Sequence, residues 1–247
     1  MYKFTATAIV LIIMVLEIRL TLLEIIYKDD HMVAINKPHG LLVHKTALAK
    51  DATEFALQML REQIGAKVYP AHRIDRKTSG VLLFALSESM NSQIQRAFSM
   101  HKIKKTYLAI VRGYTADAGS IDYPLKNDNG VVQEAITHFT TLQRTEVDVP
   151  SSIHKSSRYS LVKIEPMHGR MHQIRRHFAH IMHPIVGDRP HGCNKQNRLF
   201  KEKWNIRTMM LHAQSLTFQH PVSEKSIHIK AKPSLEFMYC KSVLGFQ

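Results

Sequence analysis

The sequence has little cysteine and no glycine-rich nucleotide loop. Its two cysteines, Cys193 and Cys240, lie far apart and form no CxxC pair, which excludes a disulfide framework and a zinc ribbon. This usage is typical of a reduced, intracellular protein, and we expect a cytoplasmic location. Without a phosphate-binding loop of the GxGxxG or P-loop kind, an ATP- or NAD-dependent activity has no support.

Long hydrophobic runs are also scarce. The run Ala6–Leu16 is apolar, but Glu17 and Arg19 interrupt it, whereas a membrane-spanning helix needs about 20 apolar residues. No small-x-small cleavage site follows, so a signal peptide is not indicated. We therefore expect residues 1–21 to be a peripheral extension, or the product of a start codon assigned too far upstream, and we expect no membrane association.

Acidic residues are fewer than basic ones. The 247 residues include 20 acids against 34 lysines and arginines, giving a net charge of +14, with 16 histidines besides. The hydrophobic content of 45% supports a folded core. Such an excess of positive charge favours a polyanionic partner, nucleic acid above all, over a protein that is merely basic and soluble.

The hydrophobic patterns alternate more often than they repeat at helical spacing. Residues 22–44 predict a β-hairpin, residues 51–64 a helix that ends at Gly65, and residues 88–99 a second helix capped by Ser87. Further strands are predicted at 104–114, 134–142, 157–166, 208–220 and 226–232, with a short helix within 169–184 and an irregular basic stretch at 187–203. Without a βαβ alternation, this indicates an α+β fold on a largely antiparallel sheet, forming a single domain over residues 22–247.

One acid stands inside a basic cluster. In the stretch YPAHRIDRKTSGVLLFALS, Asp75 lies among Arg73, Arg76 and Lys77, directly before a run that predicts a buried strand. The loop could be a surface salt-bridge network. It could equally hold a catalytic carboxylate, because neighbouring cations favour the ionised form of an acid.

A second polar cluster lies in GRMHQIRRH, where Arg170, Arg175 and Arg176 occur with His172 and His177. At helical spacing these residues form two polar stripes. Such a density of charge is costly unless it faces phosphate, a carboxylate or water. Tyr107, in an alternating run, would by itself be an ordinary strand tyrosine with a satisfied hydroxyl.

Taken together, five segments resemble the RluA-type pseudouridine synthases: NKPHGLLVH, HRIDRKTSGVLLFA, KKTYLAIVRG, GRMHQIRRHFAH and MMLHAQSLTFQHP. The resemblance runs from about Leu22 to the end, and HRxDR followed by TSG is its most specific part. HPIVGDRPHG followed by QNRLFKEKW is more similar to the branch that acts on tRNA than to the ribosomal members. The sequence departs from the family at the extension before Leu22, at Ile74 in place of leucine, and at HPVSEKS in place of a glycine turn.

The resemblance implies an isomerisation of uridine to pseudouridine that uses neither a cofactor nor a metal. It implies that Asp75 is the nucleophilic carboxylate, that Arg175 forms an ion pair with it, and that Tyr107 packs on the uracil and takes the proton from C5. The carboxylate could attack ribose C1′, act on the base, or remove a sugar proton. The branch resemblance implies uridine-65 of tRNA as the target. We expect the protein to be a monomer.

The target uridine must leave its helix to reach such a site. Arg73 resembles the family arginine that enters the vacated space. Other basic residues are candidate phosphate contacts, although each alone could be a solvated surface charge: Lys37, Lys77, Arg170, Arg176 and Arg198.

Three other functions fit parts of the sequence. A ribosomal RNA pseudouridine synthase of the same family would use the same motifs. A metal-dependent hydrolase could use the closely spaced histidines His168, His172, His177, His180 and His183, but their segment holds three arginines and no acid. A noncatalytic RNA-binding protein would explain the charge but not Asp75 within HRxDR.

Overall fold

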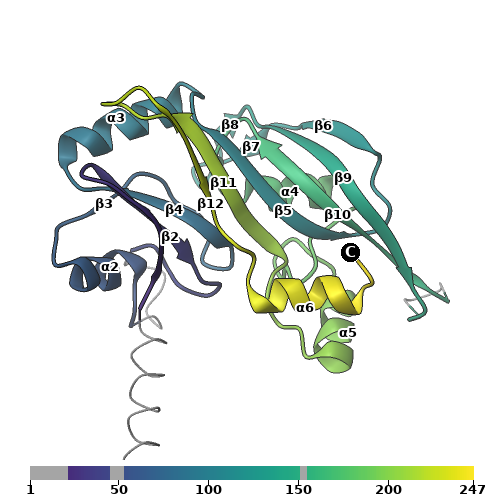
Figure 1. The fold of residues 1–247 in the computed structure, drawn as a ribbon. Coiled ribbons are helices and arrows are strands. Elements are labelled where there is room, and N and C mark those ends of the chain that lie inside the picture. Colours follow the sequence, from purple (N-terminus) through teal and green to yellow (C-terminus); the bar gives the residue numbers. More distant parts are fainter. Residues whose placement is uncertain (1–21, 45–52, 151–154) are drawn as a thin grey trace, which may run out of the picture.

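The chain is built around one long mixed sheet (Figure 1). The computed structural model describes residues 22–44, 53–150 and 155–247. Within these ranges ten strands join in the order β1-β2-β4-β11-β5-β10-β9-β6, with β3 beside β4 and β12 beside β11. Only the β4–β11 pairing is parallel among the described strands, which confirms the predicted α+β fold. The sheet strands are β1 (Glu24–Lys28), β2 (Met32–Lys37), β3 (Tyr69–Pro70), β4 (Ser79–Ala85), β5 (Lys104–Arg112), β6 (Ala118–Asp122), β9 (Ile136–Val147), β10 (Ser157–Pro166), β11 (Leu211–Gln219) and β12 (Ser226–Lys230).

Helices cover both faces of the first half of the sheet. The helix α2 (Ala56–Ile64) packs on one face of β2 and β4, against Ile35 and Phe84. The helix α3 (Glu88–Ser99) packs against Ala34 and Leu83, whose side chains point to the opposite face because strand residues alternate. All seven residues of β4 are buried, as expected for a strand covered on both sides.

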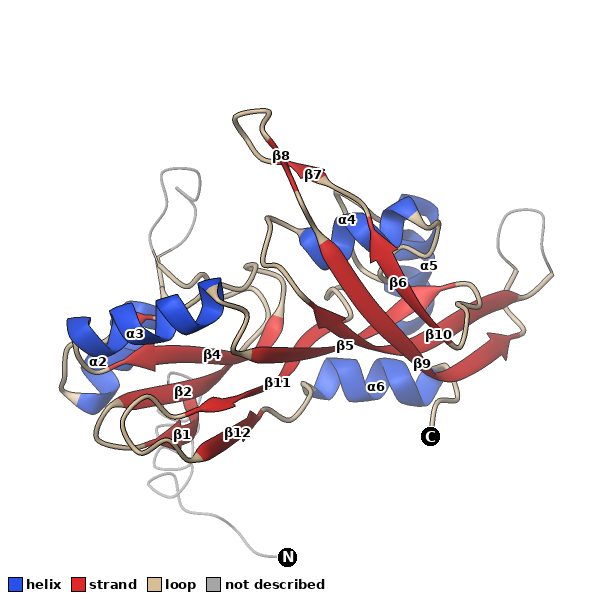
Figure 2. Ribbon diagram, turned by 90° about the horizontal axis from the view of Figure 1, so that it is seen from above, coloured by secondary structure: helices blue, strands red, loops and turns tan. Residues whose placement is uncertain are grey.

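The second half of the sheet carries three further helices among the described residues. The largest hydrophobic cluster joins β5, β10 and β11 to α4 (Gln173–His180), α5 (Asn194–Trp204) and α6 (Leu235–Val243). A small hairpin of β7 (Leu125–Lys126) and β8 (Val132–Gln133) projects beyond the sheet next to α4 (Figure 2). None of the helices formed by the described residues is long and apolar enough to span a bilayer.

The structure confirms most predicted elements and corrects two. The predicted hairpin forms as β1 and β2, and Ser87 caps α3 by accepting a hydrogen bond from the Met90 amide. The prediction of an irregular stretch at residues 187–203 is wrong, because α5 occupies its second half. The helix α6 was not predicted, although Pro233 and the cap residue Ser234, which accepts a hydrogen bond from the Phe237 amide, mark its start. The extension at residues 1–21 lies outside the described residues.

Candidate active site

The loop that carries Asp75 runs from β3 to β4 and is held on both sides. The ring of His72 accepts a hydrogen bond from the Leu83 amide at 3.1 Å. Burial lowers the pKa of His72 to about 4, so the ring is neutral and able to accept. On the other side, Arg76 and Gly40 exchange hydrogen bonds through the Gly40 amide at 2.8 Å and the Arg76 Nε at 3.0 Å. His72 and Arg76 therefore hold the loop that carries Asp75 in place.

The sheet pairing explains why the loop is followed by a glycine, Gly80, in the sequence TSG. Gly80 has a φ of +110°, and its backbone pairs with Ala213 at the parallel contact between β4 and β11. A Cβ at this position would collide with the Ala213 carbonyl, so only glycine permits the contact. The contact joins the two halves of the sheet, and it begins four residues after Asp75 along the chain, at Ser79.

The charged partner of Asp75 is Arg175, on α4. Arg175 Nη1 donates a hydrogen bond to Asp75 Oδ2 at 3.0 Å. The same guanidinium donates from Nε to Asp188 Oδ2 at 2.7 Å and from Nη2 to Asp188 Oδ1 at 2.9 Å. The side chains of Arg175 and Asp188 are 4% and 1% exposed, whereas that of Asp75 is 28% exposed. One buried arginine thus links a buried acid to an accessible one.

The electrostatics of the buried pair favour the charged forms of Asp188 and Arg175. Burial by itself would raise the pKa of Asp188, but the hydrogen bonds and charge of Arg175 outweigh it, and the pKa lies below its ordinary value. Burial would lower the pKa of Arg175, but the two carboxylates raise it. A buried guanidinium is stable only when its donors are paired, and Asp188 and Asp75 together supply that pairing.

Two histidines complete the surroundings of Asp75. His172, which precedes α4 with a φ of 54°, places its Nε2 4.0 Å from Asp75 Oδ2. Its Nδ1 lies 3.0 Å from His191 Nε2. Burial lowers the pKa of both rings, with the charge of Asp75 opposing this at His172 and that of Asp188 at His191. In a hydrogen bond between two imidazole rings one nitrogen donates and the other accepts, so the tautomers of His172 and His191 are coupled.

Asp75 opens into a pocket of about 90 Å³. Tyr107, on β5, lines the same pocket. Burial raises the pKa of Tyr107 well above its ordinary value, and the negative charge of Asp75 adds to this, so the phenol keeps its proton at neutral pH. The remaining lining residues include apolar and basic side chains from the Asp75 loop, β10, β11 and the start of α4. They are Arg73, Ile74, Thr78, Pro166, His168, Gly169, Arg170, His172, Gln173, Ile174, Arg175 and Leu211.

The structure brings the three residues predicted to be catalytic to one pocket, and of the predicted RNA contacts Arg73 and Arg170 line that pocket. Arg73 is exposed at the pocket, and Arg198 is exposed on α5. Arg170 donates to the Glu134 carbonyl and Arg176 to the Lys126 carbonyl, so both arginines hold the hairpin segment. A guanidinium has five N–H donors, so these contacts leave the predicted phosphate role possible in both cases. Lys77 is half-buried, and burial lowers its pKa, as do Arg189 and Arg175.

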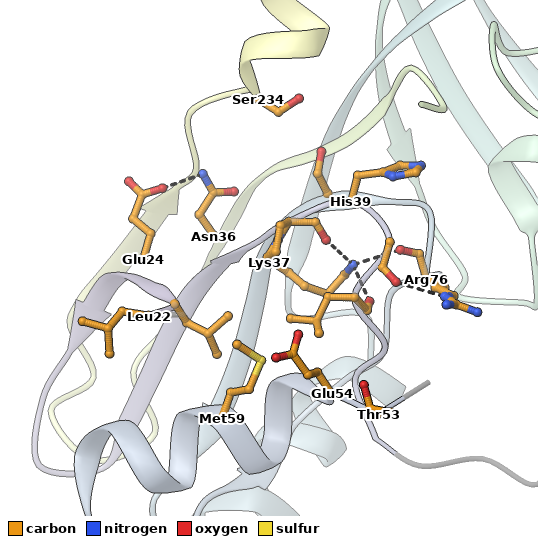
Figure 3. Close-up of a pocket in the computed structure, with 15 residues that line it drawn as sticks. Leu22, Glu24, Asn36, Lys37, His39, Thr53, Glu54, Met59, Arg76 and Ser234 are labelled. Carbon is orange, nitrogen blue, oxygen red and sulfur yellow. Dashed lines mark hydrogen bonds between the residues drawn. The ribbon is translucent and has the colours of Figure 1, made fainter. Parts of the chain in front are cut away.

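Lys37 does not fit the predicted phosphate role. Its side chain is fully buried, and its Nζ donates to the carbonyls of Pro38, Leu41 and Arg76 at 2.8, 2.8 and 3.2 Å (Figure 3). An ammonium has three donors, and all three are used. The prediction for Lys37 is therefore corrected: this lysine joins the turn after β2 to the Asp75 loop. It lines a separate pocket of about 620 Å³, to which Asp75, Tyr107 and Arg175 do not contribute.

The five histidines of the metal alternative point in different directions. His168 accepts a hydrogen bond from the Ile136 amide, His177 bonds the Tyr123 carbonyl, and His183 bonds the Arg112 carbonyl. His180 stacks on Tyr123, and His172 pairs with His191. Within the part of the chain that the structure describes, no three His, Cys, Asp or Glu side chains are grouped as metal ligands would be. The hydrolase hypothesis therefore has no geometric basis in these residues.

Sequence reasoning missed Asp188 and His191. Both lie in HPIVGDRPHG, which was used only as a mark of resemblance. The signal was present, because Asp188 is an isolated acid beside Arg189 in a basic stretch, the pattern that drew attention to Asp75. Its partner is 13 residues away in sequence, on a different element, so the pattern alone could not name it.

Comparison with known proteins decides the family. The profile described as RNA pseudouridylate synthase matches residues 31–180, which include Asp75, Tyr107 and Arg175. The chain belongs to this family. It is 44% identical over 221 residues to the tRNA pseudouridine synthase C of Vibrio cholerae, covering 85% of this chain and 91% of that protein. It is 46% identical over 219 residues to the protein of the same name from Haemophilus ducreyi, covering 85% and 90%.

Solved structures show the same fold. Human RNA pseudouridylate synthase domain containing 4 superposes with a TM-score of 0.70 at 24% identity, covering 91% of this chain and 94% of that one. Human RNA pseudouridylate synthase domain containing 1 gives a TM-score of 0.67 at 22% identity, covering 85% and 83%. The mixed sheet with its flanking helices is therefore a pseudouridine synthase fold.

Proposed function

We propose that this protein isomerises a uridine of tRNA to pseudouridine with Asp75 as its nucleophile. The observation that carries the proposal is the environment of Asp75: an accessible carboxylate at a small pocket, hydrogen-bonded through one oxygen to a buried arginine. A nucleophilic carboxylate must be ionised and must offer an oxygen to the substrate. Asp75 Oδ2 is bound to Arg175, and Asp75 Oδ1 accepts no hydrogen bond from the described residues.

The reaction exchanges one bond for another without net redox change. The N1–C1′ bond of uridine breaks, the uracil turns while it is held, and a C5–C1′ bond forms. The proton at C5 is lost and N1 gains one, so atoms balance without water or an oxidant. Asp75 can assist by attacking C1′, by acting on the base, or by removing a sugar proton, and in each route Arg175 stabilises the carboxylate whenever it is charged.

Tyr107 is proposed to hold the uracil and to handle the C5 proton. Its ring lines the pocket with Asp75, where it can pack on a planar base. Because its pKa is raised, the hydroxyl is protonated in the resting enzyme. It can therefore accept the C5 proton only as it passes its own proton on, which makes it a relay rather than a preformed base.

The basic surroundings of the pocket support an RNA substrate. Arg73 is exposed beside Asp75, where it could occupy the space that a flipped uridine leaves, and Arg198 is exposed on α5. The relatives at 44% and 46% identity are named for tRNA, which favours tRNA over ribosomal RNA. Uridine-65 is our finer proposal, resting on the resemblance of HPIVGDRPHG and the residues after it to the tRNA branch.

Asp75→Asn tests the proposal. Asparagine keeps the shape of the side chain but removes its charge, so neither nucleophilic attack nor proton abstraction by this group remains. We expect pseudouridine formation to fall below detection while tRNA affinity stays close to that of the parent. Tritium release from C5-labelled tRNA and filter binding would measure both on one preparation. Asp117→Asn is the matched control, because the Asp117 carboxylate is exposed and bonds Arg144 on the surface.

If the Asp75→Asn protein turns over at a substantial fraction of the parental rate, Asp75 is a salt-bridge residue and the proposal fails. Mapping pseudouridine in total tRNA with and without the protein then tests the position. Modification at a site other than uridine-65 would overturn the finer proposal and leave the reaction itself intact.

A further inference from the structure

The segment between α4 and α5 holds Asp188 in a fixed position next to Arg175. Gly187 has a φ of +80°, and a Cβ there would collide with the Thr208 carbonyl, so the backbone before Asp188 fits only glycine. The side chain of Asn197, on α5, accepts from the Gly187 amide at 2.9 Å and donates to the Asp188 carbonyl at 2.7 Å. The backbone that carries Asp188 is therefore fastened to a helix.

The carboxylate of Asp188 takes two of the three guanidinium nitrogens of Arg175. The bonds to Nε and Nη2 form a bidentate pair, the most directional arrangement available to an arginine. Only Nη1 is left to point at Asp75. Without Asp188, the guanidinium could turn and pair with Asp75 through two nitrogens, which would occupy both oxygens of the nucleophile.

We propose that Asp188 is a positioning residue for the isomerisation, because it restricts Arg175 to a single hydrogen bond with Asp75 and so keeps Oδ1 of Asp75 available to the substrate. The inference rests on the proposed role of Asp75. It assigns a role to an acid that is 1% exposed and does not line the Asp75 pocket. Asp188 therefore acts through Arg175 and not by contact with RNA.

The test is Asp188→Asn in the full-length protein, measured by the single-turnover rate at saturating enzyme and by filter binding to tRNA. Asparagine keeps the volume but offers Arg175 only one acceptor. Because misplacing a catalytic group by about 1 Å can cost on the order of 100-fold in rate, we expect a single-turnover rate reduced by about that factor, with tRNA affinity unchanged. Asp117→Asn, at an exposed acid, should leave both quantities at the parental values.

A double-mutant cycle with Arg175→Lys separates positioning from a general loss of structure. Lysine keeps the charge but has no fork for Asp188 to hold. If Asp188 acts only through Arg175, the double variant should be no slower than the slower single variant. Rate losses that multiply in the double variant, or a parental rate in Asp188→Asn, would overturn the inference.

Folding is controlled for by a second variant. Asn197→Ala leaves both charges in place and removes only the side chain that fastens the Asp188 backbone. It should lower the single-turnover rate by a smaller factor, again without a change in affinity, and a parental rate would count against the inference. An inactive Asp75→Asn with a fully active Asp188→Asn would reject the role of Asp188 alone, whereas an active Asp75→Asn would reject the proposed function.

Discussion

Replacing Arg175 by alanine tests the electrostatic basis of the site most directly. The substitution removes three hydrogen bonds to two carboxylates and leaves Asp188, which is 1% exposed, as a buried charge without its partner. Breaking a buried pair in this way costs about 3–5 kcal/mol of stability. This is a large part of the total of about 5–15 kcal/mol typical of a domain, so the variant should be assayed at low temperature, with its folding checked.

The catalytic loss should exceed any loss in binding. Removing one preorganised donor beside the reacting group costs about 10²-fold or more in rate, and Arg175 is too deeply buried, at 4% exposed, to contact a phosphate. We therefore expect turnover at saturating tRNA to fall by at least about 10²-fold with little change in affinity. Single-turnover tritium release, filter binding and thermal melting on one preparation would measure the three effects.

Arg176→Ala is the matched control for this experiment. Arg176 is the next residue on α4, and its guanidinium is half-exposed and donates to the Lys126 carbonyl. We expect the opposite pattern there, with weaker tRNA binding and a nearly parental rate at saturation. If Arg175→Ala instead lost binding and turnover in equal measure, Arg175 would be a phosphate contact and the reasoning about Asp75 would be wrong.

Three further predictions concern other parts of the chain. Lys37→Met should remove the amine that three carbonyls share, which as a neutral amine at pH 9 still offers two N–H donors, and lower the free energy of unfolding by about 2–3 kcal/mol at that pH. It should not weaken tRNA binding. Burial lowers the pKa of Lys37 from 10.5 to about 7 in the folded protein. Between pH 7 and pH 10.5 the unfolded chain binds the Lys37 proton and the folded one does not. The stability of the parent relative to the variant should therefore increase with pH, by up to about 1.4 kcal/mol per pH unit. A stability difference that stays constant or shrinks as pH rises would contradict this. Affinity for tRNA should fall steeply as salt rises, because lysines and arginines displace counterions from the phosphates. Arg198→Ala should reduce the slope of log K against log salt by about 1. A flat dependence would show that the net charge of +14 does not drive binding. A protein that starts at Leu22 should fold and retain activity, since every recognised motif follows that residue; loss of either in the shortened protein would show that residues 1–21 contribute to the domain.

The sequence alone was sufficient for the kind of fold and for naming Asp75 as the candidate nucleophile. Alternating hydrophobic residues are a local signal, so β5, β10 and β11 could be predicted from their own segments. The N-cap residue Ser87 likewise predicted the start of α3. The prediction failed where local preference is weak. The helix α5 lies in a basic, mostly polar run in which only a few residues, such as Gln196 and Phe200, are buried. This buried face of the helix becomes visible only when the helix is seen packed in the structure.

The pairing of charges was decided by the tertiary structure. Asp75 has three cations beside it in sequence, yet its hydrogen bond comes from Arg175, 100 residues away. The nearby Arg76 instead bonds the Gly40 carbonyl, and Lys37 is buried among carbonyls rather than exposed to RNA. Asp188 has a role only because the chain returns it to the same arginine. A sequence records which residues can carry charge, but an ion pair depends on the distance between the charges and on their burial. At Asp75 both the distance to Arg175 and the burial are set by the parallel contact of β4 with β11 and by the packing of α4.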